Sequence, residues 1–357
     1  FPSVSAAYRI SEEPFWKPIK NVFNNMKIRL SYGSLGNQQI GYYDYYQSIS
    51  TEGTMSYSHD GKTLSGHATV GDPVTTGTWE TVVSKNLGFD FGFFGDKLTL
   101  ESDFYIRDTK DMLTKAMTLP AVYGSSAPKT NAADLSTRGY EITVSWRDGF
   151  NLAGKPFNYG VSASLGDYKT IITKYDNESK LLSDHYVGKV LGDIWGYTTD
   201  GLFATDEEAA AYAAQVNDKN ANKGVYAGKA PYNKLMAGDI KYVDVDGSGA
   251  IDTGANTLDD PGDRKIIGNT KPRYNYSLRG DFQWMGIDFQ MFFQGVGKIS
   301  WMPAANCIYF WNTYSYHRPT FIPKDFAAKC WSDEEGADNS DVLYPRRRGR
   351  MSASSYL

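Results

Sequence analysis

The stretch "KLTLESDFYIR", residues Lys97 to Arg107, decides the fold because apolar and polar residues alternate along it. An alternation of period two predicts a β-strand with one apolar and one polar face. One face would carry Leu98, Leu100, Ser102, Phe104 and Ile106. The opposite face would carry Lys97, Thr99, Glu101, Asp103 and Arg107.

The same alternation recurs along the chain and predicts about eight strands in all. The other stretches are "SVSAAYRI", "MKIRLSYG", "NLGFDFGFF", "YEITVSWR", "FNYGVSASLG", "YNYSLRGDF" and "IDFQMFFQ". The composition agrees, since aromatic residues make up 15% of the chain and there are 35 glycines. Aromatic residues favour strands, and glycines favour the turns between them.

The expected connections alternate between short and long. The short ones are "FFGDK", "RDGFNLAGKP" and "QWMG". The long ones run over about 34–78, 110–137, 167–271 and from 296 onward. Short turns at one end and long loops at the other are typical of a transmembrane β-barrel, with strands that are apolar outside and polar inside. Such a barrel pairs every backbone group, as lipid requires.

A soluble antiparallel β-sandwich, whose apolar faces meet in a core, explains the alternation as well. Two features favour the barrel. The polar faces of the expected strands carry Glu, Asp and Arg rather than chiefly Thr and Ser. Aromatic residues also fall near the expected strand ends, as in the interfacial girdle of a membrane protein; they are Trp79, Tyr140, Trp146, Phe157 and Trp284.

Net charge argues against nucleic-acid binding, cysteine spacing against a zinc site, and the lack of known motifs against catalysis. The net charge is −4, and the only dense basic run is "RRRGR" at 346–350, which we expect in a solvated loop. Cys307 and Cys330 lack zinc-ligand spacing, and one bridge between them stays open. No GxSxG or HExxH motif occurs, so no enzyme is expected. The histidines sit singly in expected loops, at His59, His67, His185 and His317.

The stretch "DVDGSGAID", from Asp244 to Asp252, follows the opening of a calcium-binding EF-hand loop. The predicted calcium ligands are Asp244, Asp246, Ser248, the Ala250 carbonyl and Asp252. The twelfth position is Ala255 instead of the usual bidentate Glu, so a later acid would have to replace it: Asp259, Asp260 or Asp263. The alternative is an Asp/Gly-rich turn without metal. A bound calcium ion would act as a structural clip.

Two aromatic-rich loops are candidate substrate contacts, because exposed rings stack on sugar faces. They are "GYYDYYQS" and "WMPAANCIYFWNTYSYHRP". The predicted contact residues are Tyr42, Tyr43, Tyr45, Tyr46, Trp301, Tyr309, Trp311 and Tyr314. Packing between loops, or against a partner, is the alternative. A capping box in "TDEEAAAYAAQ" also predicts a helix after Thr205, and a second short helix is expected after Pro323.

Several stretches, in order along nearly the whole chain, resemble the SusC/RagA family of TonB-dependent outer-membrane transporters. They are "FPSVSAAYRISEEPF", "IRLSYGSLGNQQIG", "WETVVSKNLGFDFGFFGDKLTLESDFYIRDTKDML", "IWGYTTDGLF", "GDIKYVDVDGSGAID" and "DDPGDRKIIGNTKPRYNYSL". The resemblance implies that residues 1–357 form a late part of a β-barrel, with 167–271 as a long extracellular loop. A signal peptide, TonB box, plug domain and final strands have no counterpart in this sequence. Barrels of such transporters have about 22 strands, so an open sheet with unpaired edges is expected.

The resemblance also implies a function, which is import of an oligosaccharide or, less often, a peptide. The barrel would sit in outer-membrane lipid, a SusD-like surface lipoprotein would close over it, and the TonB complex would act through the plug. No reaction would be catalysed. A soluble, calcium-stabilised β-sandwich acting as a carbohydrate-binding or adhesion module stays open as the alternative.

Overall fold

The structure is a computed structural model that describes residues 1–37, 46–47, 49–59, 62–70, 77–115, 129–216, 235–302 and 326–346. It divides into two compact units. The first unit comprises residues 1–178, 184–191 and 271–299, and the second comprises 179–183, 192–270 and 300–357.

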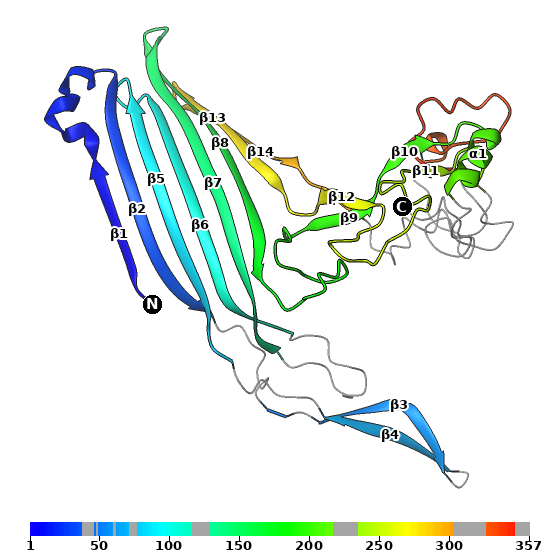
Figure 1. The fold of residues 1–357 in the computed structure, drawn as a ribbon. Helices are drawn as coiled ribbons and strands as arrows, with labels where there is room; N and C mark the ends of the chain where they lie inside the picture. Colours follow the sequence, from blue (N-terminus) through cyan, green and yellow to red (C-terminus); the bar gives the residue numbers. More distant parts are fainter. Residues whose placement is uncertain are drawn as a thin grey trace. The chain divides into compact units, whose positions relative to one another are not determined.

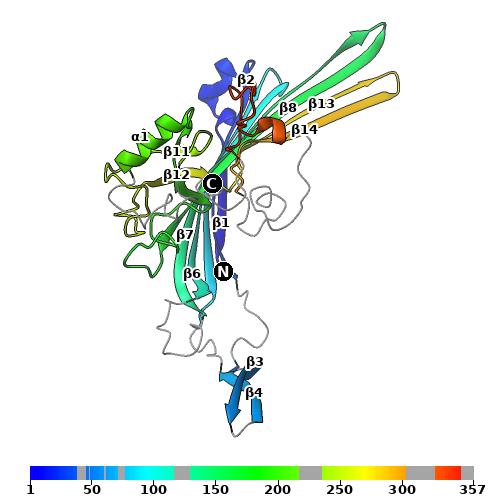
Figure 2. The ribbon, with the colours of Figure 1, turned by 90° about the vertical axis from the view of Figure 1, so that its right-hand side faces the viewer.

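The first unit is built on one antiparallel sheet of eight strands in the order β1-β2-β5-β6-β7-β8-β13-β14 (Figure 1). The strands are β1 (Ser3–Arg9), β2 (Phe23–Asn37), β5 (Glu80–Phe93), β6 (Leu98–Lys115), β7 (Lys129–Leu152), β8 (Lys155–Lys174), β13 (Arg273–Trp284) and β14 (Ile287–Lys298). Each corresponds to one predicted strand, so the prediction of about eight strands is confirmed. The sheet is open, with β1 and β14 at its edges. Figure 2 shows its twist, with β13 and β14 directed away from β1.

The strands are longer than the alternating stretches. β7 has 24 residues and β8 has 20, whereas about nine to eleven residues cross a bilayer. Polar residues continue these strands past the apolar band at the end where the long connections lie. Tyr140 is therefore in the middle of β7, and its predicted place near a strand end is wrong. The connection between β2 and β5 also holds a hairpin that was not expected, β3 (Ile49–His59) and β4 (Lys62–Val70).

Strand register separates the side chains into two faces. One row across the sheet places apolar residues side by side, running Phe91, Leu100, Val144, Ala163, Leu278 and Phe293. Another row places Arg29, Gly88, Asp103, Glu141, Gly166 and Asn275 side by side. Residues paired across strands point to the same side of a sheet. The predicted division into an apolar and a polar face is therefore confirmed.

The apolar face is exposed instead of packed into a core. Large apolar side chains that are a third or more exposed on it are Leu30, Leu87, Phe104, Val144, Val161, Leu278, Phe289 and Phe293. A sandwich would cover this face with a second sheet. The other sheets in the described residues are two-stranded. Within the described residues, the apolar face of the sheet therefore has no sandwich core over it and matches the expected barrel wall.

Aromatic rings gather at the end of the sheet where the connections are short. Phe23 stacks on Phe93 with ring centroids 4.5 Å apart, and Phe157 stacks on Phe282 at 5.6 Å. Trp146 lies 6.5 Å from the Phe94 ring. The predicted girdle residues Trp146, Phe157 and Trp284 lie at this end, whereas Trp79 precedes β5 at the opposite end.

In its described residues, the second unit contains small sheets and an α-helix around its own core. Its pairs are β9 (Asp193–Tyr197) with β12 (Arg264–Asn269) and β10 (Thr199–Leu202) with β11 (Ile240–Tyr242). Its helix is α1 (Asp206–Val216), and a 3-10 turn, η4, spans Ala327–Lys329. The core consists of Phe203, Ala209, Val216, Leu235, Ile240, Tyr242 and Ile251. None of the helices in the described part of the chain combines the length and apolar character that a membrane crossing needs.

Helix α1 begins as the capping box predicts. The Thr205 hydroxyl accepts a hydrogen bond from the Glu208 backbone N–H at 3.1 Å. The Glu208 carboxylate accepts one from the Ala204 N–H at 2.9 Å and another from Lys241 at 3.1 Å. These bonds lower the pKa of Glu208. The short helix expected after Pro323 is present as η4.

Candidate functional site

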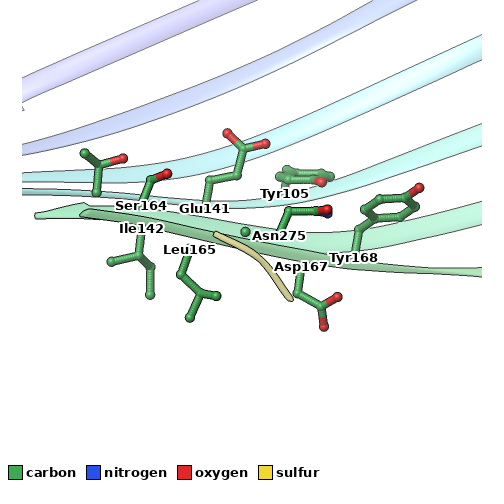
Figure 3. Close-up of a pocket in the computed structure, with 10 residues that line it drawn as sticks. Tyr105, Glu141, Ile142, Ser164, Leu165, Asp167, Tyr168 and Asn275 are labelled. Atoms are coloured by element: carbon green, nitrogen blue, oxygen red, sulfur yellow. The ribbon is translucent and has the colours of Figure 1, made fainter. Parts of the chain in front are cut away.

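The polar face of the sheet holds a recess of about 450 Å³ over β6, β7, β8 and β13. The lining residues that belong to the polar face are Tyr105, Glu141, Thr143, Ser164, Gly166, Tyr168 and Asn275. Figure 3 shows Tyr105, Glu141, Ser164 and Tyr168 on one side of the strands, with Ile142, Leu165 and Asp167 on the other. The recess is therefore a feature of the polar face, built by alternate residues of neighbouring strands.

Two glycines shape the floor of the recess. Gly139 pairs with Tyr105 on one side and with Tyr168 on the other. A Cβ at Gly139 would lie 2.5 Å from the Tyr105 ring, so the ring lies across β7 only because no side chain stands there. Gly166 likewise pairs with both Glu141 and Asn275 and leaves the space between them open. Glycine within a strand often marks such close approaches.

A second recess, of about 490 Å³, continues from the first across β13 and β14. The two share Ser164 and Asn275. The Ser164 and Ser277 hydroxyls are 2.6 Å apart, and Gln294 extends the lining. Together the two recesses form a band of hydroxyl, amide, carboxylate and phenol groups. Such groups hydrogen-bond a polar ligand, and the two rings offer apolar faces to it.

A charge network occupies the same face on β2, β5 and β6. The Arg29 guanidinium donates to the Asp90 carboxylate at 2.9 Å and to both Asp103 oxygens at 3.0 and 2.9 Å. Asn86 also donates to Asp103 at 2.8 Å. The Arg29 guanidinium thus binds one carboxylate on each of two neighbouring strands. We interpret this network as a lock on strand register, because its charges are already satisfied by one another.

The second unit contains the acidic loop that the sequence singled out. Carboxylate oxygens of Asp244, Asp246 and Asp263 lie within 4.8 Å of one another. Asp263 is fully buried, and its carboxylate accepts hydrogen bonds from the backbone N–H groups of Val245 at 2.7 Å and Asp252 at 2.8 Å. Burial raises the pKa of Asp263, while the two N–H bonds act in the opposite direction. The loop therefore closes around one desolvated carboxylate.

The predicted ligands converge only in part. Asp244 and Asp246 join the cluster, whereas the Asp252 carboxylate accepts a hydrogen bond from the Gly254 N–H at 2.8 Å. The Ser248 hydroxyl donates to the Ala250 carbonyl at 3.1 Å.

Of the three later acids, Asp263 enters the cluster, while Asp259 pairs with Lys180 and Asp260 accepts from the Ala255 N–H. Calcium binding here stays a prediction.

No protein-family model matches the chain. TonB-dependent receptor P3 of Formosa agariphila is 26% identical over 318 residues, which is 82% of this chain and 28% of that relative. TonB-dependent receptor SusC of Bacteroides thetaiotaomicron is 26% identical over 260 residues, which is 67% of this chain and 25% of that relative. The solved RagAB peptide importer in its open-open state matches with a TM-score of 0.63 at 16% identity, over 99% of this chain and 34% of that chain. This chain is similar to TonB-dependent receptors of the SusC/RagA kind.

The SusC/RagA-like chain spans about 28% of the length of the curated relatives that it matches first. A second solved structure, of the RagAB peptide transporter, matches with a TM-score of 0.56 at 17% identity, over 82% of this chain and 28% of that chain. At such identities the structural likeness shows the fold alone. It agrees with the sequence relatives, which carry the family resemblance.

The predicted aromatic contacts in this SusC/RagA-like chain are only partly visible. Tyr46 and Trp301 are 61% and 74% exposed. The remaining six lie outside the described residues; they are Tyr42, Tyr43, Tyr45, Tyr309, Trp311 and Tyr314. Cys330 is buried and Cys307 is outside the described residues, so their pairing stays untested.

Sequence reasoning did not find Tyr105 and Tyr168 of the recess. A signal was present, because Tyr105 is an aromatic residue in the polar phase of "KLTLESDFYIR".

Proposed function

We propose that this chain forms part of the wall of an outer-membrane, TonB-dependent importer of oligosaccharides, with peptides as the alternative substrate class. The observation that carries the proposal is the in-register, eight-stranded sheet with one exposed apolar face and one polar face. It occurs in a chain related to TonB-dependent receptors. Each face suits a different solvent.

The physical argument for a membrane is that the exposed apolar face is unfavourable in water. In water, the exposed apolar face would attract another apolar surface and the protein would aggregate. In lipid, the same face is solvated by acyl chains, and the polar face lines an aqueous or plugged interior. The edge strands β1 and β14 would then pair with further strands of the same barrel, because lipid tolerates no unpaired strand edge.

The recess on the polar face is the proposed wall contact for substrate. Tyr105 and Tyr168 offer ring faces for stacking on a sugar, while Ser164, Asn275 and Glu141 offer hydrogen bonds to its hydroxyl groups. Rings and mostly uncharged polar groups favour a sugar over a peptide with charged ends. The likeness to the RagAB peptide importer supports the peptide alternative.

Further partners follow from the same proposal. A SusD-like surface lipoprotein would cover the long-connection end, and the TonB complex would act on a plug domain of the full-length protein. The RagAB and SusC relatives support a lipoprotein partner and TonB dependence. No reaction is proposed, because the relatives that the chain matches are named receptors.

Uptake in a strain that depends on the full-length protein tests the function. We expect accumulation of labelled oligosaccharide to require the protein and the proton-motive force. Tyr105→Ala and Tyr168→Ala should each reduce uptake, and Tyr105→Phe should retain most of it. Tyr32→Ala, on the exposed apolar face, is the matched control and should leave uptake unchanged. Unchanged uptake after complete deletion would overturn the transport proposal, and peptide accumulation alone would replace the substrate class.

A further inference from the structure

Three tight turns at the short-connection end of the sheet have a non-glycine apolar residue with a positive φ angle at their tip. Phe94, Ala153 and Met285 have positive φ angles of 56°, 53° and 51°, and each is followed by a glycine that also has positive φ. Ala153–Gly154 and Met285–Gly286 are two-residue hairpin loops. In such turns Asn, Asp or Gly normally takes the first position, because a left-handed backbone disfavours larger side chains.

Two features of Phe94 and Met285 are therefore unfavourable. Their backbone conformation is unfavourable for a large side chain, and their side chains are 49% and 62% exposed in the folded unit. Neither residue gains enough burial to explain its choice. An apolar contact outside this chain explains both, because it would compensate for the strain at the turn and for the exposure.

The connection between β1 and β2, residues 10–22, lies at the same end of the sheet and also carries outward apolar residues. It contains the 3-10 turns η1 (Ile10–Glu12) and η2 (Pro14–Ile19). Trp16 is buried, donates its ring N–H to the Phe23 carbonyl at 2.8 Å and lies 4.9 Å from the Phe23 ring. That anchor leaves Phe15 and Ile19 outward, 68% and 48% exposed.

Phe94 and Met285 lie close in sequence to aromatic residues of the apolar face. Phe93, next to Phe94, stacks on Phe23, and Phe282, three residues before Met285, stacks on Phe157 and Phe289. The outward residues are spread over connections from one edge of the sheet to the other. A protein partner would have to follow this whole edge, whereas a lipid leaflet contacts every turn at the same depth.

Charged groups beside the turns have both signs. Lys97 pairs with Asp148 at 2.8 Å, and Lys20 pairs with Glu12 at 3.0 Å. Lys17 and Lys155 are exposed on the same edge. A mixture of signs fits a zwitterionic phospholipid surface, and lysine stems can lie along acyl chains while their ammonium groups reach the phosphates.

We propose that the short-turn rim, defined as Phe15, Ile19, Phe94 and Met285, inserts into the boundary between headgroups and acyl chains of a phospholipid leaflet. The turn tips are then membrane anchors and not solvent-exposed loops. The inference rests on the proposed placement of the sheet in a membrane. It adds where the leaflet ends, which is at the turn tips.

Depth-dependent fluorescence quenching tests the rim. The full-length protein, with Cys307 and Cys330 replaced by Ser, would carry one fluorophore-labelled cysteine and be reconstituted in phosphatidylcholine vesicles. The acyl chains would be unlabelled, brominated near the headgroup or brominated near their ends. We expect labels at Met285→Cys and Phe94→Cys to be quenched by the shallow bromines and shielded from aqueous iodide. Gln283→Cys, on the polar face, is the matched control and should not be quenched by lipid.

A label at Leu278→Cys, on the apolar face within β13, separates the rim proposal from the membrane proposal. If Leu278 is quenched by lipid while Met285 and Phe94 are quenched by iodide, the rim proposal fails and the membrane proposal stands. If no position is quenched by lipid, both fail.

Because Cys330 is buried and its replacement can impair folding, a photo-cross-linking amino acid at Met285 gives a second readout. Cross-linking to phospholipid supports the rim, whereas cross-linking to a protein alone overturns it.

Discussion

The sheet of the first unit and the core of the second unit use apolar residues in opposite ways. In the sheet, Leu30, Phe104 and Phe289 are among many large apolar side chains that stay exposed. In the second unit, Phe203 is fully buried, and Ile240 and Ile251 are nearly so. The second unit therefore folds as a protein does in water. The exposed apolar face of the sheet supports the proposed placement in lipid.

The largest effect is expected from Phe203→Ala in the second unit. Removing a fully buried Phe leaves a cavity, and the free energy of unfolding should fall by about 3–5 kcal/mol. Hydrogen exchange of residues 192–216 and 235–270 measures it. Val243→Ala, at an exposed position in the same unit, is the control. Loss of protection in the sheet as well would contradict the separate behaviour of the two units.

The next largest effect is expected from a charge on the apolar face. Leu30→Arg should destabilise the protein in vesicles by up to about 2–4 kcal/mol, the cost of a lipid-facing cation near the bilayer centre. Ser31→Arg, on the adjacent polar position of β2, should cost far less. Reversible unfolding from vesicles gives both values. Equal losses of stability in the two variants would contradict a lipid-facing apolar face and a separate polar face.

A smaller effect is expected at the acidic loop. Asp263→Ala leaves the backbone N–H groups of Val245 and Asp252 without their acceptor but also removes a desolvated carboxylate, so the net cost should be about 1–3 kcal/mol. Protease cutting between Gly238 and Gly268 should therefore speed up, whereas Asp259→Ala, at an exposed position, should not change it.

Calcium is tested on the same loop. If the ion binds, chelation accelerates cutting of the native loop, and Asp244→Ala abolishes that acceleration. Cutting that is indifferent to chelator and to Asp244→Ala would refute the calcium prediction.

The smallest effect is expected at the start of α1. Thr205→Ala removes the cap on the Glu208 N–H and should cost about 0.5–2 kcal/mol, while Thr205→Ser should cost less. The pH dependence follows from the lowered pKa of Glu208. Its contribution is present above the pKa of the unfolded chain and is lost as the pH falls through the lower folded pKa. Thermal unfolding over that acidic range checks both statements.

The strands were predictable from sequence because alternation is a local property, and "KLTLESDFYIR" carries it within one strand. Strand ends were not, since the apolar pattern stops while β7 continues from Lys129 to Leu152. The recess was not predictable either. Tyr105, Gly139 and Tyr168 belong to three strands, and only strand register places them side by side. Asp263 was named among three acids, but only folding brought it to Asp244.

Lipid accessibility along β6 tests the central claim most directly. Single cysteines at consecutive positions from Leu100 to Arg107 would be labelled in the full-length protein in vesicles, with lipid-borne and aqueous quenchers applied in turn. The apolar-face positions Leu100, Phe104 and Ile106 should respond to the lipid-borne quencher. The polar-face positions Glu101, Asp103 and Tyr105 should be shielded from it. Equal aqueous quenching at all positions, with no alternation, would contradict a membrane wall.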